Sequence, residues 1–270
     1  MRGQKVVLVT GASSGIGRTV AEHLAARGHR VFGAQRRAPA DGGSAVESVA
    51  MDVTDEASVE RAVASILERA SRIDAVVNNA GNAIMGAVED TSIEEAKAQL
   101  DTNFFGVLRV CRAVLPHMRE QGGGHIVNVS SLAGVLGLPF SGLYSASKFA
   151  LEGMTESLRH ETRGFGIQVV LIEPGDFQSA LATSRRMAQG SAQNAAYRDA
   201  LARVQAQQEK DEASAPTPEP IARLVERILA DPRPSLRYSA GMLGQRVVIP
   251  AKRLLPQRLF EWTLIRVLGL

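Results

Sequence analysis

The stretch from residue 5 to residue 28 constrains the fold more than any other. A short apolar, β-branched run (KVVLVT, 5–10) leads directly into the turn GASSGIG (11–17), and a helical pattern follows and ends at Gly28. A continuous apolar run is typical of a parallel strand buried on both faces. Glycines let backbone N–H groups approach a pyrophosphate, and the helix N-terminus favours its charge. The stretch predicts a dinucleotide site, with the spacing GxxxGxG in place of GxGxxG.

Further apolar runs alternate with helical patterns along the chain. We expect strands at 29–34, 49–51, 74–78, 125–130 and 168–173, and helices at 55–70 (with Thr54 as N-cap), 93–118, 144–163 and 220–230. Strands that alternate with helices indicate a parallel sheet with right-handed crossovers. The 270 residues, 45% of them hydrophobic, suffice for one large core. The predicted class is α/β, a single Rossmann-like doubly wound parallel sheet with helices on both faces, over residues 1–270 as one domain.

The end of the second predicted strand indicates which nicotinamide cofactor would bind. A site for NAD(H) carries an acidic residue there, which binds the ribose 2′-hydroxyl. This chain has Arg36 and Arg37 instead. Guanidinium groups hold a 2′-phosphate, which an acid would repel. The pattern favours NADP(H) over NAD(H), and the alternative is a solvated basic turn.

Tyr144 and Lys148 are the candidate catalytic pair. They lie four residues apart in YSASK, which places both side chains on one face of a helix. A lysine ammonium about 4 Å from a phenol would lower the phenol pKa by roughly three units. Such a group could donate and accept protons near pH 7. Ser131, at the end of an apolar run, could hold a substrate carbonyl. A chance pairing of Tyr and Lys is the alternative.

Other polar or glycine-containing positions follow the predicted strands or interrupt a helix. The turn Asn78-Asn79-Ala80-Gly81 would let a cofactor lie against the backbone, and Pro174-Gly175 ends a strand at its carboxyl edge, where ligands bind in such sheets. Asn103 is a polar residue within the long helical region. It would either kink or cap the helix, or fix a water or a backbone group near Lys148.

Composition excludes several classes of function. The net charge is only +3 and single-sign blocks of five or more residues are absent, so nucleic acid is not an expected partner. The single cysteine, Cys111, lies in an apolar helical run and is expected to be a buried thiol in a reducing compartment. None of the five histidines is paired at metal-ligand spacing, so no metal site is expected. We expect a cytoplasmic protein without a spanning helix.

Two segments differ in composition from the rest of the chain. Residues 177–216 are rich in Ala, Gln and Arg, and could be a helical substrate lid or a partly disordered insertion. Residues 231–270 hold seven Lys or Arg, two acids and the only Trp, and end in an amphipathic stretch. This C-terminal extension could lie on a membrane surface, close a substrate pocket, or pack on a partner subunit or on the body of the protein.

With these motifs in hand, the chain resembles a short-chain dehydrogenase/reductase of the type with about 250 residues. The resemblance covers residues 5–180. It rests on TGASSGIG (10–17), Asp52-Val53, NNAG (78–81), Asn103, Ser131, YSASK (144–148) and PG (174–175), in order and at family-like spacing. The segment around YSASK is similar to members that act on hydroxysteroids, retinoids and other lipophilic alcohols.

The resemblance implies a role for each matching position. Tyr144 would be the acid–base, Lys148 would lower its pKa and bind the nicotinamide ribose, Ser131 would orient the carbonyl, and Asn103 would hold a water in a proton relay. The cofactor would contact Gly11, Ser13, Ser14, Gly15, Ile16, Gly17, Arg36, Arg37, Asp52, Val53, Asn79, Ala80, Gly81, Tyr144, Lys148, Pro174, Gly175 and Ser179. Ser179 would replace the threonine that the family often has after PG.

These expectations predict an NADP(H)-dependent oxidoreductase that interconverts a secondary alcohol and a ketone, or a related aldehyde. The substrate would be a lipophilic small molecule, and the resemblance implies a homodimer or homotetramer through the helices at 93–118 and 144–163. The alternative is an NADP(H)-binding sensor or scaffold without turnover. Peripheral membrane contact through the C-terminal extension is a third possibility.

Overall fold

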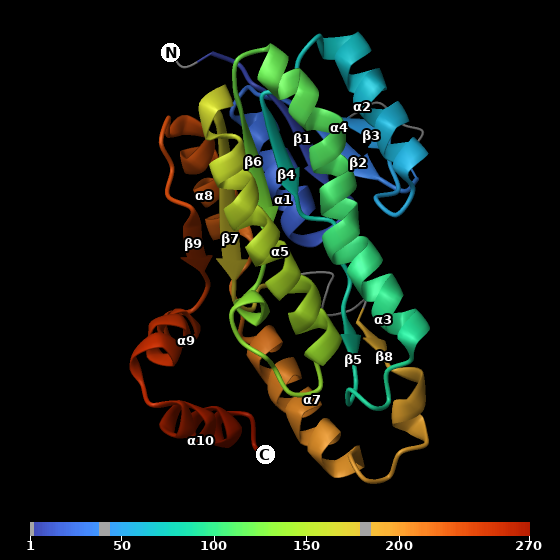
Figure 1. Cartoon of the computed structure of the whole chain (residues 1–270), viewed down its shortest axis with the longest axis vertical. Helices are drawn as coiled ribbons and strands as arrows, with labels where there is room; N and C mark the ends of the chain where they lie inside the picture. Colours follow the sequence, from blue (N-terminus) through green and yellow to red (C-terminus); the bar gives the residue numbers. More distant parts are fainter. Residues whose placement is uncertain (1–2, 38–43, 179–184) are drawn as a thin grey trace.

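A seven-stranded parallel sheet forms the centre of the computed structural model, which describes residues 3–37, 44–178 and 185–270 (Figure 1). The strands lie in the order β3-β2-β1-β4-β6-β7-β9. Their bounds are β1 Val6–Thr10, β2 Arg30–Gln35, β3 Val46–Ala50, β4 Ala75–Asn78, β6 Gly124–Val129, β7 Ile167–Pro174 and β9 Arg237–Ala240. The predicted fold class is confirmed.

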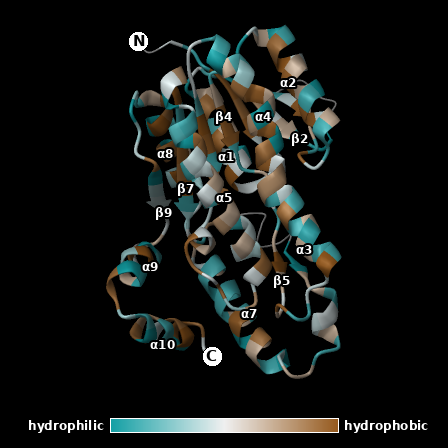
Figure 2. Ribbon diagram, viewed as in Figure 1, coloured by the Kyte–Doolittle hydropathy of each residue, from teal (hydrophilic) through white to brown (hydrophobic). Residues whose placement is uncertain are grey.

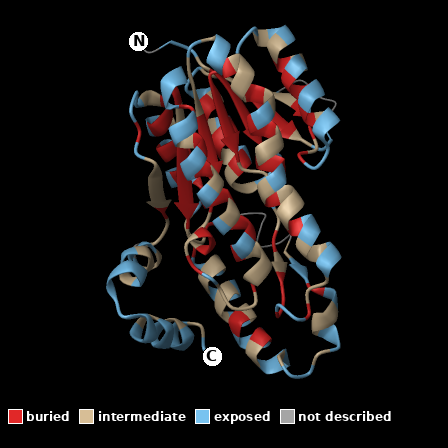
Figure 3. Ribbon diagram, in the orientation of Figure 1, coloured by how far each residue is buried: buried red, intermediate tan, exposed pale blue. Residues whose placement is uncertain are grey.

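Helices cover both faces of the sheet. They are α1 Gly15–Ala26, α2 Glu56–Ala70, α3 Ile93–Leu100, α4 Gly106–Glu120, α5 Gly142–Glu161, α7 Arg198–Ala213, α8 Glu219–Ala230, α9 Leu243–Leu254 and α10 Gln257–Val267. Alternation along β1 divides the core, because successive side chains point to opposite faces. Val7 and Val9 pack with α1 and α8, whereas Val6 and Leu8 pack with α2, α4 and α5. The strands form the apolar, buried centre of the molecule (Figures 2 and 3).

Three predictions of local structure need correction. The cap of α2 is Asp55, whose carboxylate accepts a hydrogen bond from the Ala57 N–H, while the Thr54 hydroxyl donates to Asp52 instead. The predicted helix over 93–118 is α3 and α4 joined by a π-helical turn, Asp101–Phe105, that contains Asn103. The seventh strand, β9, was missed, because RYSA lacks the apolar run of a central strand.

The segment between β7 and α8 extends beyond the sheet at the carboxyl ends of the strands (Figure 1). β5 (Ile84–Met85) and β8 (Arg186–Met187) form a separate two-stranded sheet. Leu201 and Val204 of α7 are buried with Met85. Where the chain is described, residues 185–216 therefore contain a helix, α7, that packs on the segment of Met85.

Candidate active site

The glycine turn after β1 is fixed by side chains from β1 and from the turn after β4. The Thr10 hydroxyl accepts from the N–H groups of Asn79 and Ala80, both at 3.0 Å. The Asn79 amide donates to the Thr10 carbonyl at 3.1 Å and to the Gly11 carbonyl at 3.3 Å. The two turns at the switch point of the sheet are thus held together. Thr10 opens the motif TGASSGIG, but nothing in the sequence indicated that its hydroxyl makes this link.

The turn has the space and the free donors that a pyrophosphate needs. A Cβ at Gly17 would lie 2.3 Å from the Gly11 carbonyl oxygen, and Gly11 and Gly15 have positive φ angles of 65° and 54°. Larger residues would therefore clash or be strained. Ser14, the N-cap of α1, makes no side-chain capping hydrogen bond, and the first turn has no acidic residue. The residues present fit the phosphates of a dinucleotide.

The end of β2 and the turn after β3 bring opposite charges together. Arg36 and Arg37 are exposed. Hydrogen bonds from the Thr54 backbone and hydroxyl hold the pKa of Asp52 below its usual value, and Arg36 and Arg109 add to the effect. Asp52 is thus an anion close to Arg36, at the place where an adenosine ribose would lie in a dinucleotide fold.

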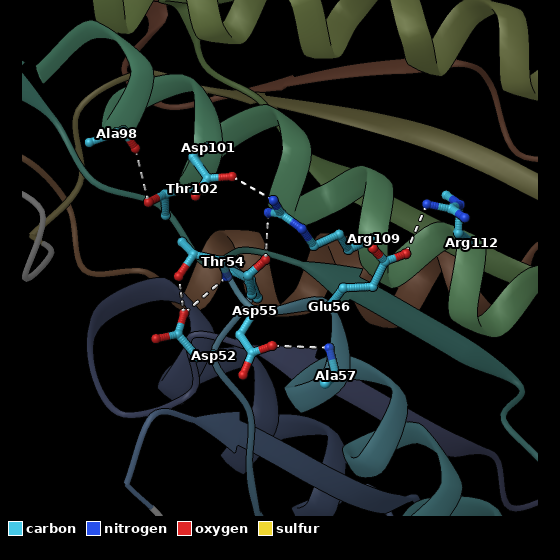
Figure 4. Close-up of polar contacts among 11 residues, drawn as sticks. Asp52, Thr54, Asp55, Glu56, Ala57, Ala98, Asp101, Thr102, Arg109 and Arg112 are labelled. Carbon is cyan, nitrogen blue, oxygen red and sulfur yellow. Dashed lines mark hydrogen bonds and ion pairs between the residues drawn. The ribbon is translucent and has the colours of Figure 1, made fainter. Parts of the chain in front are cut away.

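Arg109 connects this turn to the π-helical turn (Figure 4). Its guanidinium donates to the Val53 carbonyl at 3.1 Å and to the Asp101 carboxylate at 2.7 Å. Within the π-helical turn, the Asn103 amide nitrogen donates to the Asn82 carbonyl, and its oxygen accepts from the Asn82 N–H at 2.9 Å. Asn103 therefore lies in a helix irregularity and fixes the backbone of Asn82.

The first turn of α5 carries the candidate acid–base. Asn103 donates to the Ser147 hydroxyl at 3.0 Å, and that hydroxyl donates to the Tyr144 carbonyl at 2.7 Å. Ser131, two residues after β6, accepts from the Ala133 N–H at 3.1 Å, and its hydroxyl acts on the pKa of the neighbouring Tyr144. The structure thus brings Asn103, Ser131, Tyr144 and Lys148 to one end of the sheet.

The prediction that Lys148 lowers the pKa of Tyr144 is wrong for this structure. Burial raises the Tyr144 pKa above its usual value, and the hydrogen bond with Ser131 only partly opposes that effect. The Lys148 ammonium instead donates to the Val129 carbonyl at 2.9 Å and lies 5.9 Å from the centre of the Tyr144 ring. Burial lowers the Lys148 pKa to about 8, against the charge of Glu152 one turn along α5.

The turn after β7 lies beside Tyr144 and is hydrogen-bonded to Gln245, near the start of α9. The Asp176 N–H donates to the Gln245 side-chain oxygen at 3.0 Å, and the Gln245 amide donates back to Asp176. A Cβ at Gly175 would meet that same oxygen at 2.2 Å. Asp176 and Arg185 influence Tyr144 electrostatically in opposite directions. Sequence spacing did not indicate that Gln245 contacts this turn. The predicted cofactor residue Ser179 lies outside the described residues.

Comparison with known proteins identifies the family. The model of the short chain dehydrogenase family matches residues 5–190. The chain belongs to the short-chain dehydrogenase family. It is therefore an oxidoreductase of a family that binds nicotinamide cofactors, and the resemblance inferred from its motifs is confirmed.

Similarity to individual members extends beyond the matched segment. The 3-ketodihydrosphingosine reductase of Bacteroides thetaiotaomicron is 39% identical over 260 residues, 96% of each chain. The estradiol 17-beta-dehydrogenase 1 of Rattus norvegicus is 34% identical over 251 residues, 86% of this chain and 72% of the other. A short-chain dehydrogenase crystal structure from Streptomyces avermitilis, 33% identical, superposes with a TM-score of 0.84 over 98% of both chains.

Proposed function

We propose that the protein is an NADP(H)-dependent oxidoreductase that interconverts a secondary alcohol and a ketone, or a related aldehyde. The observation that carries the proposal is the Ser131–Tyr144 hydroxyl pair, with Lys148 one turn along α5, beside a glycine turn shaped for a dinucleotide. When bound, the nicotinamide supplies or accepts the hydride. The acid–base assignment is tested with Tyr144→Phe, which should lose most of its turnover and keep its affinity for NADPH.

Each catalytic side chain then has a separate task. The pKa of Tyr144 is raised, so at neutral pH the phenol keeps a proton that it can donate to a substrate oxygen during reduction. The Ser131 hydroxyl would hydrogen-bond the same oxygen and orient it. Lys148, with its pKa near 8, would carry a positive charge at pH 7 and bind the nicotinamide ribose. Asn103 would position α5 through Ser147 and hold a water for proton relay.

The remaining cofactor contacts follow from the same placement. The pyrophosphate would lie over Gly11, Ser13, Ser14, Gly15, Ile16 and Gly17, the adenosine near Asp52 and Val53, and the nicotinamide half near Asn79, Ala80, Gly81, Pro174 and Gly175. Arg36 and Arg37 would hold the 2′-phosphate. The support is their exposure at the end of β2, where no acidic side chain follows the strand.

Arg36→Asp should exchange the cofactor preference. We expect NADPH binding to weaken by about tenfold to a hundredfold, because a charged hydrogen bond is lost and an acid faces the phosphate. NADH binding should be unchanged or tighter. Isothermal titration with each cofactor measures both affinities, and Arg61→Asp, at an exposed arginine of α2, is the control with the same change of charge. Unchanged NADPH affinity in Arg36→Asp would refute the assignment.

A lipophilic substrate fits this site best among the classes considered. The relatives named above are a reductase of 3-ketodihydrosphingosine and a dehydrogenase of estradiol, and both compounds are mostly hydrocarbon. Residues 177–216 would form the lid over such a substrate, since α7 packs on Met85 beyond the carboxyl ends of the strands. We place the protein in the cytoplasm, in keeping with a single buried cysteine.

Assembly into a homodimer or homotetramer is the proposed state in solution. Phe105, at the start of α4, and Phe149, on α5, are both exposed, on the helices expected to form the contact. Sedimentation velocity should give a mass of two or four chains, and the double variant Phe105→Ser/Phe149→Ser should lower it. A monomer at every concentration would contradict the proposal.

A further inference from the structure

The C-terminal helices α9 and α10 differ from every other helix in what they leave exposed. No described side chain in either helix is buried. In Figure 3 both helices are drawn in the colours of exposed and intermediate residues. Among the described residues, eight of the fourteen most exposed large apolar side chains lie between residues 247 and 270. They include Leu254 at 82% exposure, Val267 at 64% and Trp262 at 53%. A soluble surface rarely gathers such side chains without a binding role.

The same segment holds the positive charge of the protein. Residues 231–270 have seven Lys or Arg and two acids, whereas the other 230 residues have 24 Lys or Arg and 26 acids. One of the seven, Arg237, is engaged with glutamates inside the fold. Five of the others, which include Arg246, Arg258 and Arg266, lie on the two exposed helices. Cations and apolar side chains thus occupy the same surface.

The two helices stand apart from the body of the molecule (Figure 1). A cavity of about 390 Å³ lies between α5 and α9, lined by Phe149, Gly153, Ile249 and Arg253 among others. Beyond it, the Arg203 side chain donates to the Gly269 carbonyl at 2.9 Å and joins the end of the chain to α7. The apolar side chains of α10 are not covered by the protein's own core.

We propose that α9 and α10 dock on the surface of an anionic phospholipid bilayer. Where the chain is described, no helix is long and apolar enough to cross a membrane. At 12 and 11 residues, α9 and α10 have the length of helices that lie in the interface. Trp262, with Leu259 and Ile265 three residues to either side, would enter the headgroup region, where tryptophan is enriched. The arginines would contact lipid phosphates.

Charge decides between a membrane and a second copy of the chain. In a two-fold pair through this surface, the same cationic patch would lie on both sides of the interface. An anionic bilayer presents the opposite charge to all of them. The inference depends on the surface alone and holds whether or not the proposed reaction is correct, because binding is measured without cofactor or substrate.

Trp262 is the only tryptophan of the protein, so its fluorescence reports directly on the proposed surface. The full chain is mixed with vesicles of phosphatidylcholine alone or with added phosphatidylglycerol. We expect the Trp262 emission to shift to shorter wavelength, and the protein to sediment, with the anionic vesicles only. Deleting 256–270 should abolish sedimentation while leaving Gln245 and its contacts in place.

Two charge variants make the test specific. A cation near an anionic surface contributes about fivefold in affinity, so Arg246→Gln/Arg258→Gln should bind anionic vesicles about 25-fold more weakly. Arg61→Gln/Arg223→Gln removes two exposed arginines from α2 and α8 and should bind like the wild type. Failure to bind anionic vesicles would overturn the proposal. So would an equal loss in both double variants, or an emission shift that appears on concentration without lipid, which would assign the surface to a second copy.

Discussion

Tyr144→Phe is expected to lower kcat by about a hundredfold to ten-thousandfold, the usual contribution of a positioned acid–base. The substitution removes only the hydroxyl that interacts with Ser131 and keeps the aromatic ring. NADPH affinity should change little, because the glycine turn and Arg36 are untouched. Turnover of a panel of ketones, followed by nicotinamide absorbance, measures kcat, and fluorescence titration measures cofactor binding.

The control for this variant is Tyr238→Phe. The Tyr238 hydroxyl accepts a hydrogen bond from the Ser235 N–H, so the substitution makes the same chemical change in β9, away from Ser131. Its kcat should equal that of the wild type. The wild-type rate of reduction should fall as the pH rises through the pKa of Tyr144, because the donor must be protonated. A Tyr144→Phe enzyme with wild-type turnover would exclude Tyr144 as the acid and would favour another proton donor.

Arg237→Met is expected to cost about 3–5 kcal/mol in the free energy of unfolding at pH 8, the usual cost of removing one partner of a buried ion pair. Arg237, on β9, makes ion pairs with Glu152 at 3.0 Å, Glu173 at 3.2 Å and Glu156. The side chains of Glu152 and Glu173 are 7% and 3% exposed. Without the guanidinium, two buried carboxylates would face each other unpaired.

The pH dependence of this loss follows from Glu173. Burial, and then the charge of Glu152, raise the Glu173 pKa from 4.5 to about 7. Between those values the folded protein keeps a proton that the unfolded chain releases, so stability falls as the pH rises through this window, by about 3 kcal/mol at most. Arg237→Met should therefore be least harmful near pH 5, where the carboxyl groups can be protonated.

Glu173→Gln separates the charge effect from a packing defect. The neutral amide has nearly the same shape, so this variant should be more stable than the wild type at pH 8 and about equal to it at pH 5. Added to Arg237→Met, it should recover part of the loss at pH 8. Urea unfolding at both pH values measures all four proteins. A loss in Arg237→Met that is the same at both pH values, and that Glu173→Gln leaves unaltered, would show that packing alone is responsible.

The parts of the fold that the sequence predicted are those with local signals. Central parallel strands are continuous apolar runs, so six of the seven strands were found. β9 was missed because it lies at the sheet edge. Its Arg237 is half-buried and forms ion pairs with α5 and β7. That partnership joins positions more than 60 residues apart, which no spacing rule reveals.

In the candidate site, too, residues with local sequence signals were predicted, and residues that act through long-range contacts were not. Tyr144, Lys148 and the glycine turn were found from short spacings. Thr10 and Gln245 act through contacts across about 70 residues, and only the folded chain shows them. The predicted lowering of the Tyr144 pKa was wrong for a different reason. Burial raises this pKa, and the Lys148 ammonium donates its hydrogen bond to the Val129 carbonyl. Neither effect can be inferred from the spacing of Tyr144 and Lys148.

Gln245 connects the last helices to the candidate active site. Its amide, at the start of α9, completes the turn that begins at Pro174 and borders Tyr144. A chain ended before residue 243 would lose this brace along with the exposed helices, and its lost turnover could be mistaken for a defect in chemistry. Gln245 would therefore connect the helices proposed to bind lipid to the turn beside Tyr144.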